Sequence, residues 1–224
     1  MPVRVLTIKE NILGANEEKA KTNRSALDKH RILMVNIMAS PGAGKTSLIL
    51  QTISRLKQKV RFAVIEGDIA STIDADKVSE QGVPAIQINT AGGCHLDANM
   101  IAKALDNLTL EDIDLVFVEN VGNLVCTAEF VLGEHKRVVL LSVPEGHDKP
   151  YKYPMMFTEA DVVLITKSDV LPHFDFNTDI FAKGVSGLNP GARIFPVSCK
   201  TGDGLEAWLA WLESALSEVK ALRT

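Results

Sequence analysis

The sequence is poor in cysteine, has no excess of positive charge and contains no long apolar run. Its three cysteines are odd in number and sparse for 224 residues, which argues against a disulfide framework and favours reduced thiols or metal ligands. With 24 basic and 28 acidic residues, the chain lacks the positive charge that binding to a nucleic acid or an anionic membrane requires. No stretch approaches the roughly 20 apolar residues of a membrane span, and the opening MPVR does not begin a signal peptide. We therefore expect a cytoplasmic protein that binds small ligands and other proteins.

Short apolar runs recur along the chain, and most are separated by segments long enough for a helix. The runs are continuous rather than alternating, which is typical of strands covered on both faces in a mainly parallel sheet. We predict one α/β domain, residues 31–224, preceded by a polar helical extension, residues 1–30. Asp203 and Glu206 predict the start of a C-terminal helix. The seven predicted strands are residues 32–38, 61–65, 85–88, 115–118, 138–143, 162–165 and 194–197.

A glycine-rich loop, ASPGAGKTS at residues 39–47, follows the first apolar run. Gly42 and Gly44 allow successive backbone N–H groups to converge on phosphate oxygens, and Lys45 supplies a positive charge. A helix beginning at about Lys45 would add the positive end of its dipole. Ala39 replaces the first glycine of the pattern G-x-x-x-x-G-K-[ST]. The loop predicts a nucleoside triphosphatase with a three-layer P-loop NTPase fold, in which a mainly parallel sheet is flanked by helices. The predicted phosphate-binding residues are Ser40, Gly42, Ala43, Gly44, Lys45, Thr46 and Ser47.

The end of a later run, ITKSD at residues 165–169, resembles the N/T-K-x-D element of GTPases. Guanine presents two neighbouring donors, N1–H and the N2 amine, which the Asp169 carboxylate can accept together, whereas N1 of adenine is an acceptor. Lys167 can lay its aliphatic stem across the purine face. Ser198, Cys199 and Lys200 resemble the S-A-K loop that supports O6 of guanine. Together these elements predict GTP rather than ATP.

Acidic residues follow two further runs, at Asp68 and at Glu119. Carboxylates at the carboxyl ends of parallel strands face the nucleotide crevice. Glu119, Thr46 and Asp68 are therefore predicted to hold Mg²⁺. Asp74, on a segment 69–76 that we expect to be mobile, is a looser candidate. Solvated surface carboxylates are the alternative interpretation of these acids.

Residues 119–122, ENVG, resemble the D-x-x-G element, whose glycine amide senses the γ-phosphate. Catalysis would rest on positioning and charge neutralisation, with water attacking the γ-phosphate in line. No water-orienting glutamine follows Gly122, and Asn123 stands nearest, so we predict slow intrinsic hydrolysis. The predicted catalytic residues are Lys45, Thr46, Asp68, Glu119 and Gly122.

A second metal site is indicated by Cys94 and His95, a thiolate beside an imidazole, with Cys126 four residues after Gly122. Adjacent strand residues point to opposite faces, so shared ligation requires a turn, which the preceding Gly92-Gly93 permits. A buried cysteine beside a structural histidine is the commoner alternative. Three ligands also fall one short of the tetrahedral set of structural Zn²⁺, and a two-fold dimer could share thiolates across its interface.

The chain resembles the HypB family, the GTPases that assist nickel insertion into [NiFe]-hydrogenase, over about residues 30–215. The resemblance rests on the strings ASPGAGKT, EGDIAS, NTAGGCHLDA, DLVFVENVGNLVCTAEFVLGEHKRVVLLSVPEG and ITKSD. It implies a GTP-dependent homodimer that binds Ni²⁺ or Zn²⁺ through Cys94, His95 and Cys126. It also implies work with a HypA-type nickel maturation factor on the hydrogenase large-subunit precursor. Some members carry an N-terminal cysteine motif or a histidine-rich tract, and residues 1–30 contain neither.

Three other functions fit parts of the pattern. A GTPase of the urease nickel-insertion type would differ in the apoenzyme that it activates. A nickel-storage protein would need no hydrolysis, because nucleotide would only stabilise its fold. An ATP-using small-molecule kinase is opposed by Asp169 and by the lack of an evident acceptor-binding lid.

Overall fold

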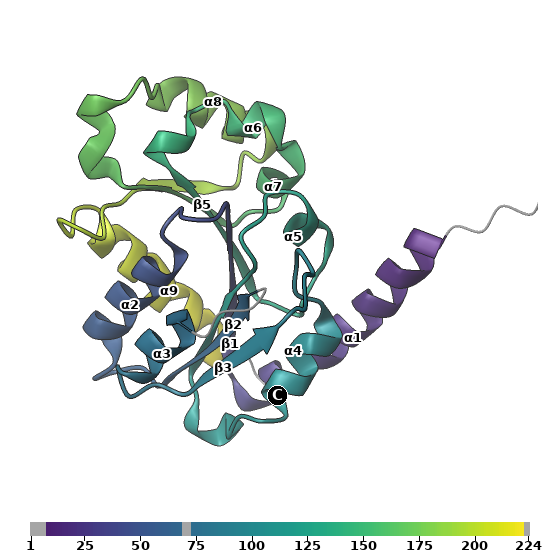
Figure 1. The fold of residues 1–224 in the computed structure, drawn as a ribbon. Coiled ribbons are helices and arrows are strands. Elements are labelled where there is room, and N and C mark those ends of the chain that lie inside the picture. The colour runs from purple at the N-terminus through teal and green to yellow at the C-terminus, as the bar shows by residue number, and fades with distance from the viewer. Residues whose placement is uncertain (1–7, 69–72, 222–224) are drawn as a thin grey trace, which may run out of the picture.

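The computed structural model describes residues 8–68 and 73–221, in which helices cover both faces of a central sheet (Figure 1). The seven strands found in these residues are all parallel and lie in the order β3-β2-β4-β1-β5-β6-β7. The predicted three-layer α/β fold is confirmed, and every predicted strand is present. The strands are β1 (Leu33–Ala39), β2 (Phe62–Asp68), β3 (Ala85–Asn89), β4 (Leu115–Glu119), β5 (Lys136–Ser142), β6 (Val162–Thr166) and β7 (Arg193–Pro196).

Helices follow most of the strands and return the chain to the start of the next one. Figure 1 shows α2, α3 and α9 on one side of the sheet and α1, α4 and α5 on the other. Among the described residues, three short 3₁₀ turns lie in other connections: η1 (Leu110–Asp112), η2 (Val143–Glu145) and η3 (Ser168–His173). The helices are α1 (Ile8–His30), α2 (Lys45–Leu56), α3 (Ile73–Ser79), α4 (Ala98–Leu105), α5 (Cys126–Glu129), α6 (Lys149–Lys152), α7 (Pro154–Thr158), α8 (Thr178–Leu188) and α9 (Leu205–Lys220).

The central strand β1 shows why its apolar run is continuous. All seven of its residues are buried, and successive side chains point to opposite faces of the sheet. Leu33 and Val35 belong to the core that α2 and α9 cover, whereas Met34 belongs to the core that contains Leu27 of α1 and residues of α4. Both faces are therefore covered.

The N-terminal helix α1 is attached to the domain from Asn16 onward. Leu27 is fully buried, and α1 contacts α4. The first turns of α1 extend beyond the body of the domain (Figure 1). The division into an extension, residues 1–30, and a GTPase domain, residues 31–224, stays a prediction.

The C-terminal helix α9 begins differently from the sequence prediction. Its N-cap is Gly204, in the left-handed region with φ 74°, and no side chain caps the helix. The Asp203 carboxylate instead accepts a hydrogen bond from the Thr201 hydroxyl at 2.7 Å. A Cβ on residue 204 would collide with the carbonyl oxygen of Pro196, so close approach and positive φ select glycine here. Within residues 8–68 and 73–221, no helix is both long and apolar enough to span a membrane.

Candidate functional site

The glycine-rich loop joins the carboxyl end of β1 to α2, at the edge of the sheet where parallel sheets bind ligands. Gly42 and Gly44 have φ values of 74° and 100°, which glycine adopts without strain. Ala39 is the last residue of β1, pairs with Leu140 and has no positive φ. The first position of the motif therefore needs no glycine in this chain, because the turn begins one residue later.

A cavity of about 450 Å³ opens above this loop. It contains most of the residues predicted to act on phosphate and Mg²⁺, whereas Ser40 and Ala43 do not line it. The Ala43 carbonyl lies beneath the loop and accepts a hydrogen bond from the buried Thr166 hydroxyl at 2.7 Å. The predicted residues that line the cavity are Gly42, Gly44, Lys45, Thr46, Ser47, Asp68, Asp74, Glu119 and Gly122.

Glu119, the last residue of β4, contacts the start of α2. Its Oε1 accepts a hydrogen bond from the Thr46 hydroxyl at 3.0 Å and lies 3.9 Å from the Lys45 ammonium. Burial raises the pKa of Glu119, although Lys45 and Thr46 act in the opposite direction. A divalent cation beside Thr46 would compensate the buried carboxylate, as expected of a Mg²⁺ site.

Glu66 in β2 also lines this cavity, and it was not among the residues predicted from the sequence. It pairs with Glu119 across the sheet and is only 3% exposed. Burial and the neighbouring carboxylate of Glu119 raise its pKa to about 10. Within the described residues, Oε1 of Glu66 and Oε2 of Glu119 are buried and have no hydrogen-bond partner. Two carboxylate oxygens without donors at the bottom of a phosphate cavity fit a cation that enters with the nucleotide.

The other acidic candidates lie at the rim of the same cavity. Asp68 is the last residue of β2 and is half-buried. Asp74 lies in the first turn of α3 and forms an ion pair with Lys77 at 2.7 Å. The segment 69–76, predicted to be mobile, is thus helical from residue 73, and residues 69–72 lie outside the described part of the chain.

A second cavity, of about 550 Å³, shares Gly44 and Ser47 with the first one, so the two lie next to each other. Asp169 accepts a hydrogen bond from the buried Ser198 hydroxyl at 2.7 Å. The Lys167 ammonium donates to the carbonyl oxygen of Gly42 at 2.8 Å and so joins this cavity to the phosphate loop. The predicted base-binding residues that line the second cavity are Lys167, Asp169, Cys199 and Lys200.

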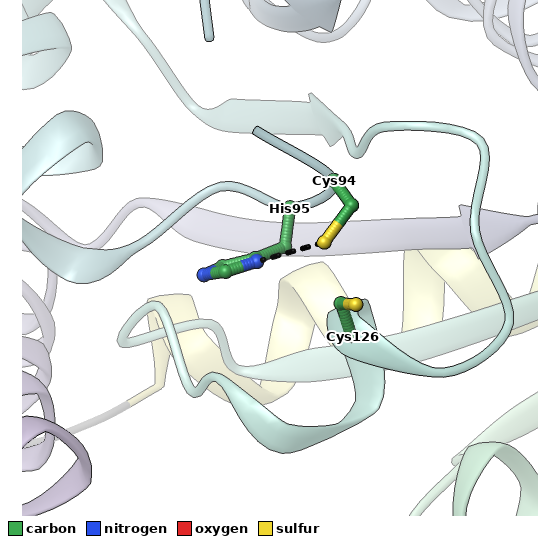
Figure 2. Close-up of side chains that lie close together, drawn as sticks. All are labelled: Cys94, His95 and Cys126. Atoms are coloured by element: carbon green, nitrogen blue, oxygen red, sulfur yellow. Dashed lines mark hydrogen bonds between the residues drawn. The ribbon is translucent and has the colours of Figure 1, made fainter. Parts of the chain in front are cut away.

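The predicted second metal site is brought together in space. One ligand atom from each of Cys94, His95 and Cys126 lies within 4.8 Å of the others. Figure 2 shows Cys94 and His95 on one loop, with Cys126 facing them from the start of α5. The loop leaves strand geometry through Ala91 and Gly92, both with positive φ, so neighbouring side chains can converge as predicted.

The surroundings of this cluster act differently on its imidazole and its thiol: they favour the metal-binding form of His95 and oppose that of Cys126. Burial lowers the pKa of His95, which stacks on the Phe130 ring at 3.8 Å, and so favours the neutral imidazole, the form that can bind a cation. The nearby thiol of Cys94 and, to a smaller degree, burial raise the pKa of Cys126. A metal that binds here would displace the thiol proton.

Two asparagines connect the phosphate cavity to this cluster. The Asn123 backbone N–H donates to the carbonyl oxygen of Ala39 at 2.9 Å, and its side-chain oxygen accepts from the Cys126 N–H at 3.0 Å. The buried Asn120 side chain accepts from the N–H of Leu96, beside His95, at 3.1 Å. Both asparagines belong to the segment that follows Glu119, so movement of this segment would reach both halves of the cluster.

Comparison with known proteins identifies the family of this arrangement. Residues 33–196 match the protein-family model described as the CobW/HypB/UreG nucleotide-binding domain. The hydrogenase maturation factor HypB of Rhizobium leguminosarum bv. viciae is 45% identical over 221 residues, which cover 99% of this chain and 74% of that protein. The chain belongs to the HypB family. The resemblance noted in the sequence is thereby confirmed.

Two solved HypB structures share this fold. The crystal structure of HypB from Helicobacter pylori, in complex with nickel, has a TM-score of 0.87 at 40% identity and covers 91% of this chain and 96% of that one. The structure of HypB from Archaeoglobus fulgidus has a TM-score of 0.85 at 38% identity, with 91% and 99% covered. The three-layer P-loop NTPase architecture is therefore that of the HypB family, whose nucleotide-binding domain is a nucleotide hydrolase fold.

Proposed function

We propose that this chain is a GTPase whose nucleotide state controls the binding and delivery of nickel during maturation of [NiFe]-hydrogenase. Membership of the HypB family supports the biological context. The observation that carries the proposal is the short connection between the two sites: Glu119, in the phosphate cavity, is only seven positions before Cys126, in the metal-ligand cluster. Asn123, within this connection, bonds both to Ala39 at the end of β1 and to Cys126.

In the proposed reaction, backbone N–H groups of the glycine-rich loop and the Lys45 ammonium bind the phosphates. Thr46, Glu119 and Asp68 would hold Mg²⁺, which neutralises charge on the phosphate oxygens. The Gly122 amide would bond the γ-phosphate. The Asn123 side-chain oxygen already accepts two N–H groups, of Val125 and Cys126, so it is not available to orient water and intrinsic hydrolysis would be slow.

Guanine would be selected by Asp169, which the Ser198 hydroxyl orients at 2.7 Å. Asp169→Asn replaces one of two acceptors with a donor, so it should weaken GTP binding at least tenfold and leave the fold intact. Asp175→Asn, at an exposed position outside both cavities, is the matched control. Competition by ATP and GTP measures the effect, and undiminished preference for GTP in the Asp169 variant would defeat the assignment.

Nickel is the proposed cargo of the Cys94–His95–Cys126 cluster, with Zn²⁺ as an alternative occupant, since thiolate and imidazole suit both. A second copy of the chain would bring two such clusters together in a homodimer. A HypA-type maturation factor and the hydrogenase large-subunit precursor, in the cytoplasm, would be the partners in delivery.

Cys94→Ala and Cys126→Ala should each weaken Ni²⁺ binding sharply, whereas Cys199→Ala, at the base cavity, should leave Ni²⁺ stoichiometry unchanged. Equilibrium dialysis with metal analysis provides the measurement. Unaltered affinity in both cluster variants would remove these residues from the site.

Nucleotide control has its own measurement. Ni²⁺ affinity should differ between the complex with GDP and the complex with a non-hydrolysable GTP analogue, because Gly122 and Cys126 share one short segment. Equal affinities would refute the coupling. Turnover of GTP separates the proposal from nickel storage, and activation of apo-hydrogenase against apo-urease separates it from the urease type.

A further inference from the structure

Two buried asparagines lie on one face of α1. Asn16 and Asn23 are seven residues apart, close to two helical turns, and are 5% and 3% exposed. α1 is otherwise largely polar and its first turns extend beyond the domain (Figure 1). Buried amide side chains almost always form hydrogen bonds, so the partners of Asn16 and Asn23 identify the segments that this face of α1 contacts.

Both asparagines bond to the same two chain segments. The Asn16 side chain accepts from the Ala98 N–H at 2.8 Å and donates to the Val131 carbonyl at 2.7 Å. The Asn23 amide donates to the Ala98 carbonyl at 2.8 Å and to the Leu132 carbonyl at 3.0 Å. The two side chains thus tie the first residue of α4 to residues 131–132, although these segments are more than 30 positions apart in the sequence.

Each of these segments carries one half of the Cys94–His95–Cys126 cluster. Ala98 comes three residues after His95, and Val131 comes five residues after Cys126. Phe130, directly before Val131, stacks on the ring of His95, with the ring centroids 3.8 Å apart. A shift of either segment along α1 would therefore change the separation between Cys126 and the pair on the opposite loop.

The contact with residues 131–134 is close enough to be rigid. Gly133 has a φ of 96°, and a Cβ on it would lie 2.8 Å from Cβ of Asn23. Arg24 donates to the carbonyl oxygens of Gly133, at 2.9 Å, and of Glu134. Because the backbone of residues 131–134 packs directly against α1, the position of the helix can determine the position of this segment.

We propose that Asn16 and Asn23 are positioning residues for the metal-ligand cluster, fixing the distance between Cys126 and the Cys94–His95 pair. The proposal rests on the metal site proposed above. It assigns to α1 a direct part in the geometry of that site.

Asn16→Leu and Asn23→Leu test this role, because leucine has nearly the shape of asparagine and no hydrogen-bonding group. Asn189→Leu is the matched control, since the half-buried Asn189 also donates to a distant carbonyl, that of Ala160 at 2.9 Å, but far from the cluster in the chain. Three quantities are measured in the full chain: Ni²⁺ affinity, the thiolate-to-nickel charge-transfer absorption, and binding of a trivalent arsenical, which requires two thiols at short distance.

The proposal expects Ni²⁺ affinity to fall at least tenfold in both variants, with an altered absorption spectrum and weaker arsenical binding. Guanine nucleotide affinity should stay within twofold of wild type, and the Asn189 variant should match wild type in all metal readouts. One folded variant of the pair suffices for the comparison.

Wild-type metal affinity and spectrum in the folded variants would overturn the positioning role and leave the metal site standing. Failure of both variants to fold would also overturn it, in favour of a purely structural role. If wild type itself bound neither Ni²⁺ nor the arsenical at these cysteines, the proposed metal site and the positioning role would fall together.

Discussion

Replacing Gly122 with alanine is expected to weaken nucleotide binding through a direct contact with the phosphate loop. Gly122 lines the phosphate cavity together with Lys45 and Thr46. Its φ is not positive, so alanine can adopt the backbone conformation without strain. The effect must therefore come from the added methyl group.

The structure gives the size of that effect. A Cβ on residue 122 would lie 2.8 Å from Cγ and 2.9 Å from both Cα and N of Pro41. Unstrained contacts between carbon atoms are about 3.5–4.0 Å, so the added Cβ and Cγ of Pro41 would have to separate by roughly 0.7 Å or more. Overpacking of this kind costs about 1–3 kcal/mol. If the cost falls on the bound state, affinity drops roughly 5- to 150-fold.

The assay is titration with GDP and with a non-hydrolysable GTP analogue, alongside thermal unfolding. We expect a larger loss for the GTP analogue, because the displaced amide is the predicted partner of the γ-phosphate. Gly187→Ala in α8 is the control, since a Cβ there meets no atom within 4 Å and alanine should stabilise a helix by roughly 0.5–1 kcal/mol. Affinities within twofold of wild type, at an unchanged unfolding temperature, would refute the reasoning.

Two further predictions concern stability. Trp208→Phe removes the buried indole N–H that donates to the Thr52 hydroxyl at 2.9 Å and leaves a cavity between α2 and α9, so chemical denaturation should show a loss of roughly 2–4 kcal/mol; a loss below about 1 kcal/mol would contradict this account. Burial alone would raise the pKa of Asp114, but hydrogen bonds from Arg61 and Lys220 outweigh it and lower the pKa. This stabilisation is present above the unfolded-state pKa of about 4 and is lost as the pH falls toward the lowered value. Asp114→Asn should therefore cost roughly 1 kcal/mol at pH 7, and urea unfolding should show the difference from wild type shrinking toward pH 3.

The sheet was predictable because its strands are buried on both faces. Runs such as residues 162–165 have no polar residue that could face solvent, and β6 spans Val162–Thr166. The strand ends were less predictable. β2 continues through Glu66 to Asp68, and β4 ends on the buried Glu119. From sequence alone, a charged residue after an apolar run predicts the beginning of a loop. In the structure, Glu66 and Glu119 instead continue their strands and pair with each other.

The candidate site could be predicted only in part, because some of its residues belong to sequence motifs and others are placed by the fold. Residues within one motif, such as Lys45 and Asp169, are recognisable from spacing. Glu66 could be recognised only from the strand register, which sets it opposite Glu119. The sequence of neither strand predicts that register, because the two strands are distant in the chain. Asn16 likewise has no motif, and its bonds to Ala98 and Val131 exist only because α1 lies across two distant loops.

The bond between the Lys167 ammonium and the Gly42 carbonyl has a consequence for ligand preference. It joins the second cavity, the proposed base site, to the phosphate loop, and the Thr166 hydroxyl adds a second tie at Ala43. Two hydrogen bonds thus hold the two halves of this crevice together, and part of the ordering of the loop belongs to folding rather than to binding. Such a crevice favours ligands that occupy both halves at once, so free guanosine and pyrophosphate should together bind far more weakly than one intact nucleotide.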